Sequence, residues 1–275
     1  MRDLERITWW QGLLVTSTVA TAAVTVWSAF KASKAVAEAL KSLSPPPYKV
    51  SGPLVSLIVP TLDEQDYLPL LLASIQNQTY KPIEVIVADS STDSTPEIAR
   101  AFGATVVRVE ELNVSLARNM GAAAAEGDIL IFCDADCIMA PDYVERMARL
   151  LQDGAVLGHG SDCVYDSEFN NLLIAPWKWL KPALWTTGRG VAIKRVDFSH
   201  AGGYDVECDP TKGCREDLAL GEAVLRTFGL GSVVRDRDAL VATSGRRPIR
   251  LGGVWRERGW RDNVIPAGAK EQTRV

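Results

Sequence analysis

The sequence predicts an α/β fold with a mostly parallel sheet, preceded by a separate apolar helix. Short apolar runs alternate with helical stretches from Leu54 onward, which is the order of βαβ units in a doubly wound sheet. Ile7 to Phe30 contains no charged residue. The chain has 275 residues, of which 47% are hydrophobic and 23% charged, so it can bury a sizeable core in one large domain.

The elements follow in order from these patterns. Strands are expected at Leu54–Pro60, Glu84–Asp89, Thr105–Val109, Ile129–Cys133 and Val191–Lys194. Helices are expected at Tyr67–Gln78, Pro96–Phe102, Ser115–Ala125 and Leu218–Phe228. In such a sheet, ligands bind beyond the carboxyl ends of the strands, so the polar residues that follow each strand are the candidates for a site.

The N-terminal segment Ile7–Phe30 is long enough to cross a membrane. As a helix it would rise about 36 Å, against a hydrocarbon core of about 30 Å. Trp9, Trp10 and Trp27 lie near its two ends, where amphipathic rings favour the interface. We expect a spanning or membrane-embedded anchor; a buried core helix, an interfacial helix and a signal peptide are the alternatives.

The lysines after this segment slightly outnumber the arginines before it, which favours a cytoplasmic position for the rest of the chain. Ser44-Pro45-Pro46-Pro47 ends the helix and begins a stiff linker. The expected division is therefore an anchor and continuing helix at 1–43, a linker at 44–49, a catalytic domain at 50–245 and a basic tail at 246–275.

Composition excludes some classes of protein. The formal net charge is −4, which gives no general attraction to nucleic acid. The five cysteines are an odd number spread along a long chain, so we expect free thiols in a reducing compartment rather than a disulfide scaffold.

Acidic residues end three of the predicted strands. The first strand runs into Pro60-Thr61-Leu62-Asp63-Glu64, the second ends at Asp89, and the strand from Ile129 leads into Asp134-Ala135-Asp136. Carboxylates gathered at one sheet edge are costly unless a cation or the hydrogen-bond donors of a ligand offset them. The sequence therefore predicts a ligand site at this edge.

Four stretches, in this order, resemble the family 2 glycosyltransferases of the GT-A fold. They are P-T-x-(N/D)-E at Pro60–Glu64, D-x-S-x-D-x-T at Asp89–Thr95, A-R-N-x-G at Ala117–Gly121 with G-D and D-x-D at Asp134–Asp136, and G-G-(F/Y)-D at Gly202–Asp205 with Glu216-Asp217. The resemblance covers about Leu54 to Arg247. It implies an inverting enzyme, of the hexosyltransferase type, that uses a nucleotide-sugar donor.

The resemblance also implies roles at the donor side. Pro60, Thr61, Glu64 and Asp89 would hold the base and ribose of a UDP- or GDP-linked sugar. Asp136, with Asp134 near the ribose or acting through water, would hold Mn²⁺ or Mg²⁺ against the diphosphate. Arg118 would brace this loop or contact the donor, or it forms only a structural salt bridge.

On the acceptor side, the resemblance makes Asp217 the general base that removes a proton from an attacking hydroxyl. Asp217 could also cap the helix that follows it. An anionic lipid phosphate needs no base, so the intact Glu216-Asp217 pair favours a hydroxyl acceptor.

Further residues belong to the same expectation. Gly202, Gly203 and Glu216 would lie near the acceptor or donor sugar, and Trp185 either forms a sugar-stacking wall, dips into the membrane or packs in the core. Arg246 and Arg247 could reach the diphosphate or rest on anionic headgroups.

The expected function is transfer of a sugar to a hydroxyl of a lipid-linked or membrane-proximal glycan, by a membrane-bound enzyme that binds no nucleic acid. Two alternatives remain: a polyprenyl-phosphate acceptor, and a non-catalytic protein that binds nucleotide sugars.

Overall fold

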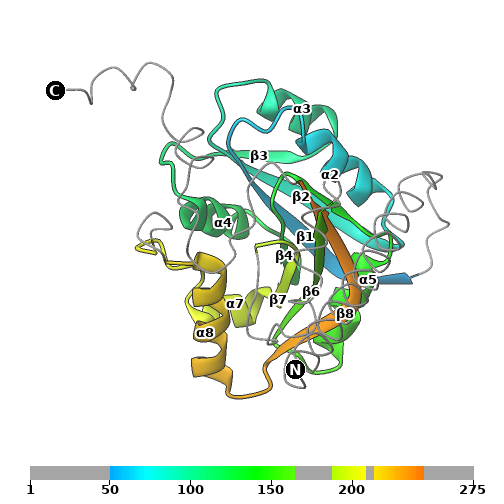
Figure 1. Cartoon of the computed structure of the whole chain (residues 1–275), viewed down its shortest axis with the longest axis vertical. Coiled ribbons are helices and arrows are strands. Elements are labelled where there is room, and N and C mark those ends of the chain that lie inside the picture. Colours follow the sequence, from blue (N-terminus) through cyan, green and yellow to red (C-terminus); the bar gives the residue numbers. More distant parts are fainter. Residues whose placement is uncertain (1–49, 165–187, 209–213, 245–275) are drawn as a thin grey trace, which may run out of the picture.

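The computed structural model describes residues 50–164, 188–208 and 214–244, which form one mixed sheet with helices on both faces (Figure 1). The sheet order is β3-β2-β1-β4-β7-β6-β8-β5. The strands are β1 (Val50–Thr61), β2 (Tyr80–Asp89), β3 (Thr105–Arg108), β4 (Ile129–Phe132), β5 (Cys137–Met139), β6 (Leu157–Val164), β7 (Val191–Lys194) and β8 (Val233–Thr243). The helices are α2 (Leu68–Gln76), α3 (Thr95–Ala101), α4 (Val114–Ala123), α5 (Tyr143–Gln152), α7 (Arg195–Ala201) and α8 (Glu216–Phe228).

The predicted parallel half of the sheet is confirmed. Strands β3, β2, β1 and β4 are neighbours, and each pair of them is parallel. The other half differs, because β7 is antiparallel to both β4 and β6, and β5 is antiparallel to β8. Only Cys133–Asp136 separates β4 from β5, which is too short for a crossover to a parallel neighbour. Strand β5 pairs instead with β8, at the far edge of the sheet.

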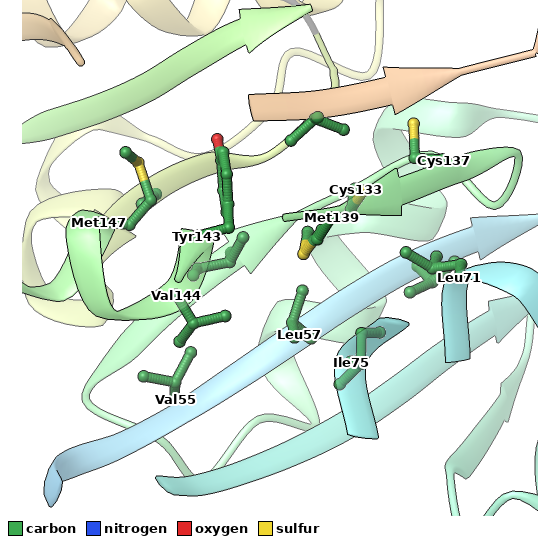
Figure 2. Packing of buried hydrophobic residues seen from close by; sticks show 14 of the residues in the cluster. Val55, Leu57, Leu71, Ile75, Cys133, Cys137, Met139, Tyr143, Val144 and Met147 are labelled. Atoms are coloured by element: carbon green, nitrogen blue, oxygen red, sulfur yellow. The ribbon is translucent and has the colours of Figure 1, made fainter. Parts of the chain in front are cut away.

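Two hydrophobic layers cover the two faces of the sheet. Alternate residues of β1 point to opposite sides, so Val55 and Leu57 belong to one layer and Ile58 to the other. On the first side, Leu71 and Ile75 of α2 pack with residues of α5 against β1 (Figure 2). The second side is covered by a layer from three other helices, with members at Ala122 of α4, Phe198 of α7 and Leu220 and Val224 of α8.

Several expectations lie outside the described residues. These are the membrane segment, the linker, Trp185, and Arg246 with Arg247. Within 50–164, 188–208 and 214–244, no helix is long and apolar enough to cross a membrane.

The expectation of five free thiols is wrong for one pair. Cys208 and Cys214 form a disulfide, with their Cα atoms 5.4 Å apart. This Cα separation lies within the usual range for a disulfide. Cys133, Cys137 and Cys163 form no disulfide, as expected, and all three are buried. This disulfide removes the argument from cysteine usage for a reducing compartment.

Candidate functional site

The ends of β1 and β2 bring two of the predicted nucleotide-binding residues together. Thr61 and Asp89 are direct partners in the parallel register, and the Thr61 hydroxyl donates to Asp89 Oδ1 over 2.8 Å. The backbone N–H of Ser91 donates to the same oxygen over 3.2 Å. Asp89 is fully buried. Its carboxylate is therefore held in one orientation by the two strand ends.

The loops that follow β1 and β2 are bound to each other. Asp63 has a φ of 54°, a left-handed conformation that Asn and Asp tolerate better than other residues, which explains why either serves at this motif position. Its Oδ1 accepts from the backbone N–H of Thr92 over 2.8 Å. The backbone N–H of Glu64 donates to the Thr95 hydroxyl over 2.9 Å, and Glu64 is itself buried. Pro60 is half-buried at the same strand end.

Arg118 connects the D-x-D loop to the first turn of α8. Its Nη2 donates to Asp134 Oδ1 and its Nη1 to Glu216 Oε1, each over 2.9 Å, and its side chain is only 2% exposed. Its guanidinium also lies over the Tyr204 ring, 5.0 Å from the centroid. Arg118 thus links the two segments by ion pairs, which agrees with both a bracing role and a purely structural salt bridge, and its contact with a donor stays a prediction.

Burial and charge act in opposite directions on Arg118. Burial lowers its pKa, but attraction from Tyr204, Asp134 and Glu216 outweighs that effect and raises the pKa above its ordinary value. The guanidinium is therefore charged at every accessible pH. Gly188 leaves room for it, since a Cβ there would lie 2.3 Å from Arg118 Nη2.

Asp136 is held by the end of β8. The Ser244 hydroxyl donates to Asp136 Oδ2 over 2.7 Å, and the Ser244 backbone N–H donates to the Asp136 carbonyl over 3.1 Å. The register of β5 and β8, which pairs Cys137 with Thr243, sets this contact. Asp136 is buried, while the Asp134 side chain is 29% exposed.

The donor set suits a hard divalent cation that is held mainly by substrate. Asp134 and Asp136 supply carboxylate oxygens, which Mg²⁺ and Mn²⁺ prefer. Among the described residues, no group of three or more His, Cys, Asp and Glu side chains is placed to hold a metal. One or two carboxylates with phosphate oxygens is the usual arrangement for a cation bound together with a nucleotide.

Asp217 lies inside the first turn of α8 rather than at its cap. The cap residue is Arg215, which makes no capping hydrogen bond through its side chain. Arg215 Nη2 instead donates to Asp217 Oδ2 over 3.1 Å, and Asp217 Oδ1 accepts from the Leu218 backbone N–H over 2.9 Å. The Asp217 side chain is 9% exposed. The alternative that Asp217 caps this helix is wrong, although a carboxylate near the helix N-terminus has the favourable sign for the helix dipole.

The two glycines of the G-G-Y-D stretch turn the chain between α7 and the next loop. Gly202 and Gly203 have φ values of 89° and 73°, which L side chains rarely adopt. The turn places Tyr204 in the second core layer, where its backbone N–H donates to Asn119 Oδ1 over 2.9 Å. Their position is therefore explained by backbone conformation.

Sequence reasoning missed three polar residues at this edge. Arg108 donates to Asp89, and Ser244 donates to Asp136. Arg189 donates to Asp162 over 3.2 Å, and although its burial lowers the pKa, attraction mainly from Asp162 raises it overall. Arg108 could have been found from its place at the end of the predicted third strand. The other two depend on β6 and β8, which the sequence did not reveal.

Comparison with known proteins identifies the family. The family model described as Glycosyl transferase family 2 matches residues 56–205, more than half of the chain. The chain belongs to glycosyl transferase family 2. It is 34% identical over 125 residues to the putative glycosyltransferase EpsH of Bacillus subtilis (strain 168), covering 43% of this chain and 36% of the relative. It is 35% identical over 103 residues to the glycosyltransferase AglE of Haloferax volcanii, covering 34% of each.

These matches span only part of each relative: 36%, 51% and 14% of the first three. The family and its relatives show that this chain is a glycosyltransferase. These findings confirm the resemblance stated from the four motifs. The activities of the full-length relatives are properties of those proteins and are not assigned to this chain.

Solved structures show the same fold. A 1–349 fragment of Staphylococcus aureus TarS superposes with a TM-score of 0.56 at 17% identity, over 70% of this chain and 61% of the other. The Pyrobaculum calidifontis mannosyltransferase PcManGT, solved with GDP-Man and Mn²⁺, gives 0.54 at 23% identity, over 81% and 67%. Glucosyl-3-phosphoglycerate synthase of Mycobacterium tuberculosis, with Mn²⁺ and UDP-Glc, gives 0.52 at 21%, over 72% and 73%. The fold is GT-A-like.

Proposed function

We propose that this family 2 glycosyltransferase is an inverting enzyme that moves a sugar from a nucleotide-diphosphate donor to a hydroxyl of a lipid-linked or membrane-proximal glycan. The observation that carries the proposal is the bridge through Arg118. It joins Asp134 of the D-x-D loop to Glu216, the neighbour of Asp217, so donor-side and acceptor-side carboxylates form one connected site. Solved structures of the same fold contain UDP-GlcNAc or GDP-Man, which supports a nucleotide-sugar donor.

The residues divide the work as follows. Thr61 and Asp89 would hold the base and ribose, and Asp136 with Asp134 would hold Mn²⁺ or Mg²⁺. When bound, such a cation neutralises charge on the diphosphate leaving group. Asp217 takes the proton of the acceptor hydroxyl as its oxygen forms a bond to the anomeric carbon.

The bond between the anomeric carbon and the diphosphate oxygen breaks as the new bond forms, and its electron pair leaves with the nucleoside diphosphate. Attack from the opposite face inverts the anomeric configuration. The ion pair with Arg215 holds the Asp217 carboxylate in one orientation. A hydroxyl is a poor nucleophile at neutral pH, so a positioned carboxylate contributes about 10²–10⁴-fold to the rate.

The membrane part of the proposal concerns residues outside the described ranges. We place an anchor and its continuing helix at 1–43, a linker at 44–49 and a basic tail at 246–275, with the catalytic domain at 50–245 on the cytoplasmic side. The support is the uncharged stretch Ile7–Phe30 and the lysines that follow it. Deletion of residues 1–43 should release a soluble domain that still binds donor. An aggregated product would contradict this division.

The test of function is hydrolysis of UDP-, GDP- and dTDP-sugars by the purified full-length protein with Mn²⁺, Mg²⁺ or EDTA. Slow metal-dependent release of one nucleotide by the wild type, absent in Asp136→Ala, is the expected result. Glu222→Gln is a matched control, because Glu222 lies on α8 with a side chain 58% exposed. Asp217→Asn should keep donor binding and lose transfer to a hydroxyl acceptor.

Two outcomes would change the proposal. Full transfer activity in Asp217→Asn would favour an anionic lipid phosphate as the acceptor, which needs no base. No hydrolysis and no thermal shift with any nucleotide sugar would favour a protein that binds sugars without catalysis.

A further inference from the structure

An arginine lies beside the buried aspartate at the nucleotide end of the sheet. Arg108 is the last residue of β3, and in the parallel register it is the direct partner of Asp89, the last residue of β2. Arg108 Nη1 donates to Asp89 Oδ2 over 3.0 Å and to the Ser91 carbonyl over 2.7 Å. The strand pairing therefore places a cation and a carboxylate side by side at this edge.

Most of the hydrogen-bonding capacity of Asp89 is already used. A carboxylate accepts about four hydrogen bonds, two on each oxygen. Oδ1 accepts from the Thr61 hydroxyl and the Ser91 backbone N–H, and Oδ2 accepts from Arg108. One acceptor position is left, on the oxygen that faces Arg108.

Arg108 has the opposite property, because part of its guanidinium is uncommitted. Its Nη1 serves Asp89 and Ser91, and its Nε lies 3.5 Å from Glu110 Oε1. Nη2 makes no hydrogen bond within the part of the chain that the structure describes. The Arg108 side chain is 48% exposed, whereas that of Asp89 is 1% exposed. The pair thus offers a ligand donors that reach solvent and, behind them, one nearly buried acceptor.

We infer that Arg108 is a specificity-determining residue that, together with Asp89, selects uracil over guanine as the base of the donor. This inference rests on the proposed function and narrows it. Uracil presents one ring N–H, at N3, between two carbonyl oxygens. The N3–H fits the remaining acceptor position of Asp89 Oδ2, and either neighbouring carbonyl fits Arg108 Nη2.

Guanine fits this pair less well. Its N1–H and O6 can meet the same acceptor and donor as uracil does, but its 2-amino group is a second donor next to N1–H, and a carboxylate satisfies both donors only with two free oxygens. Here Oδ1 is already filled by Thr61 and Ser91, so the amino group has no acceptor at Asp89. A polar group left unpaired on binding lowers affinity by about tenfold or more.

A purely structural role for Arg108 would be to neutralise the buried carboxylate. Arg100 provides the contrast, because it pairs with Glu97 on the exposed surface of α3, where the side chains are 60% and 67% exposed. Both roles predict that loss of Arg108 disturbs Asp89. Only base selection predicts that replacement of Arg108 changes how strongly nucleotide affinity depends on the carbonyl oxygens of the base.

The experiment is calorimetric titration of the purified full-length protein with UDP, GDP, 2-thio-UDP and 4-thio-UDP, in the presence of Mn²⁺. The thio analogues replace one carbonyl oxygen by sulfur, a weak acceptor. The wild type should bind UDP at least about tenfold more tightly than GDP, and one of the two thio analogues several-fold more weakly than UDP. Arg108→Ala should bind UDP about tenfold more weakly and no longer distinguish that thio analogue from UDP.

Two variants keep the test decisive. Arg108→Lys retains the positive charge beside Asp89 but not the fork of donors, so it should fold even where alanine does not, and should lose most of the thio discrimination. Arg100→Ala, checked by circular dichroism like the others, should match the wild type with every nucleotide.

The outcomes separate this inference from the proposed function. If the Arg108 variants weaken all four nucleotides by one common factor, Arg108 is structural and the inference is wrong, while the proposed function stands. A wild type that prefers GDP, or tighter UDP binding by Arg108→Ala, also overturns it. A wild type that binds no nucleotide overturns the proposed function and this inference together.

Discussion

Replacement of Arg118 by alanine should destabilise the domain more than any single substitution of an exposed charge. The side chain is 2% exposed and makes two ion pairs of 2.9 Å, to Asp134 and Glu216. Removal of this cation leaves two carboxylates facing each other in a largely buried place. Breaking a buried ion pair by deleting one partner costs about 3–5 kcal/mol.

The size of the effect can be stated as a shift in melting temperature. For a domain of about 150–250 residues, each kcal/mol lowers the Tm by about 2–4 °C, so Arg118→Ala should lower it by about 6–20 °C. The lost contact with the Tyr204 ring, 5.0 Å away, acts in the same direction. Arg100→Ala, which removes an exposed pair, should change the free energy of unfolding by no more than about 0.5 kcal/mol.

The assay is urea unfolding followed by circular dichroism, on the wild type, Arg118→Ala, Glu216→Ala and the double variant. Coupling between the two residues should appear as a double variant that is less destabilised than the sum of the single ones, by about 1–3 kcal/mol. Strict additivity, or a loss below about 1 kcal/mol in Arg118→Ala, would refute the idea that this bridge holds the D-x-D loop to α8.

Three other predictions concern buried tyrosines and the disulfide. The Tyr204 hydroxyl has no hydrogen-bond partner among the described residues, so Tyr204→Phe should keep or slightly raise stability in urea. Tyr143→Phe should instead lose about 1–3 kcal/mol of stability, because the Tyr143 hydroxyl donates to the Gly190 carbonyl and accepts from the Gly160 N–H. Burial raises the pKa of Tyr204 in the folded protein. The stability linked to this shift is complete below the unfolded pKa of about 10 and is lost as the pH rises towards the folded-state pKa. Alkaline titration above pH 10 should therefore destabilise the wild type more than Tyr204→Phe. Native protein should expose no thiol to Ellman's reagent, and mild reduction should make the partly exposed Cys214 thiol reactive, while Cys208 is buried. Immediate labelling without reductant would contradict the disulfide.

Much of the site follows from strand order, which is why the sequence could predict it. The apolar runs that become β1, β2 and β4 are continuous and bounded by polar residues, so their carboxyl ends, at Thr61, Asp89 and Asp134, could be assigned to one edge of a parallel sheet. The ends of the four predicted helices differ from those of α2, α3, α4 and α8 by no more than two residues, whereas α5 and α7 were not predicted. A buried strand can be recognised from its own continuous run of apolar residues, without knowledge of its partners.

The sequence by itself determined the parallel half of the sheet, the acidic residues at its edge and, through its motifs, the family. The tertiary structure decided which partner each of those residues has. Arg118 reaches Glu216 across 98 positions of the chain, and Ser244 reaches Asp136 across 108. These contacts depend on β8 and on the first turn of α8, whose places are set by packing rather than by local pattern. Local propensity cannot encode a partner so distant in the sequence, because only the folded chain brings the two together.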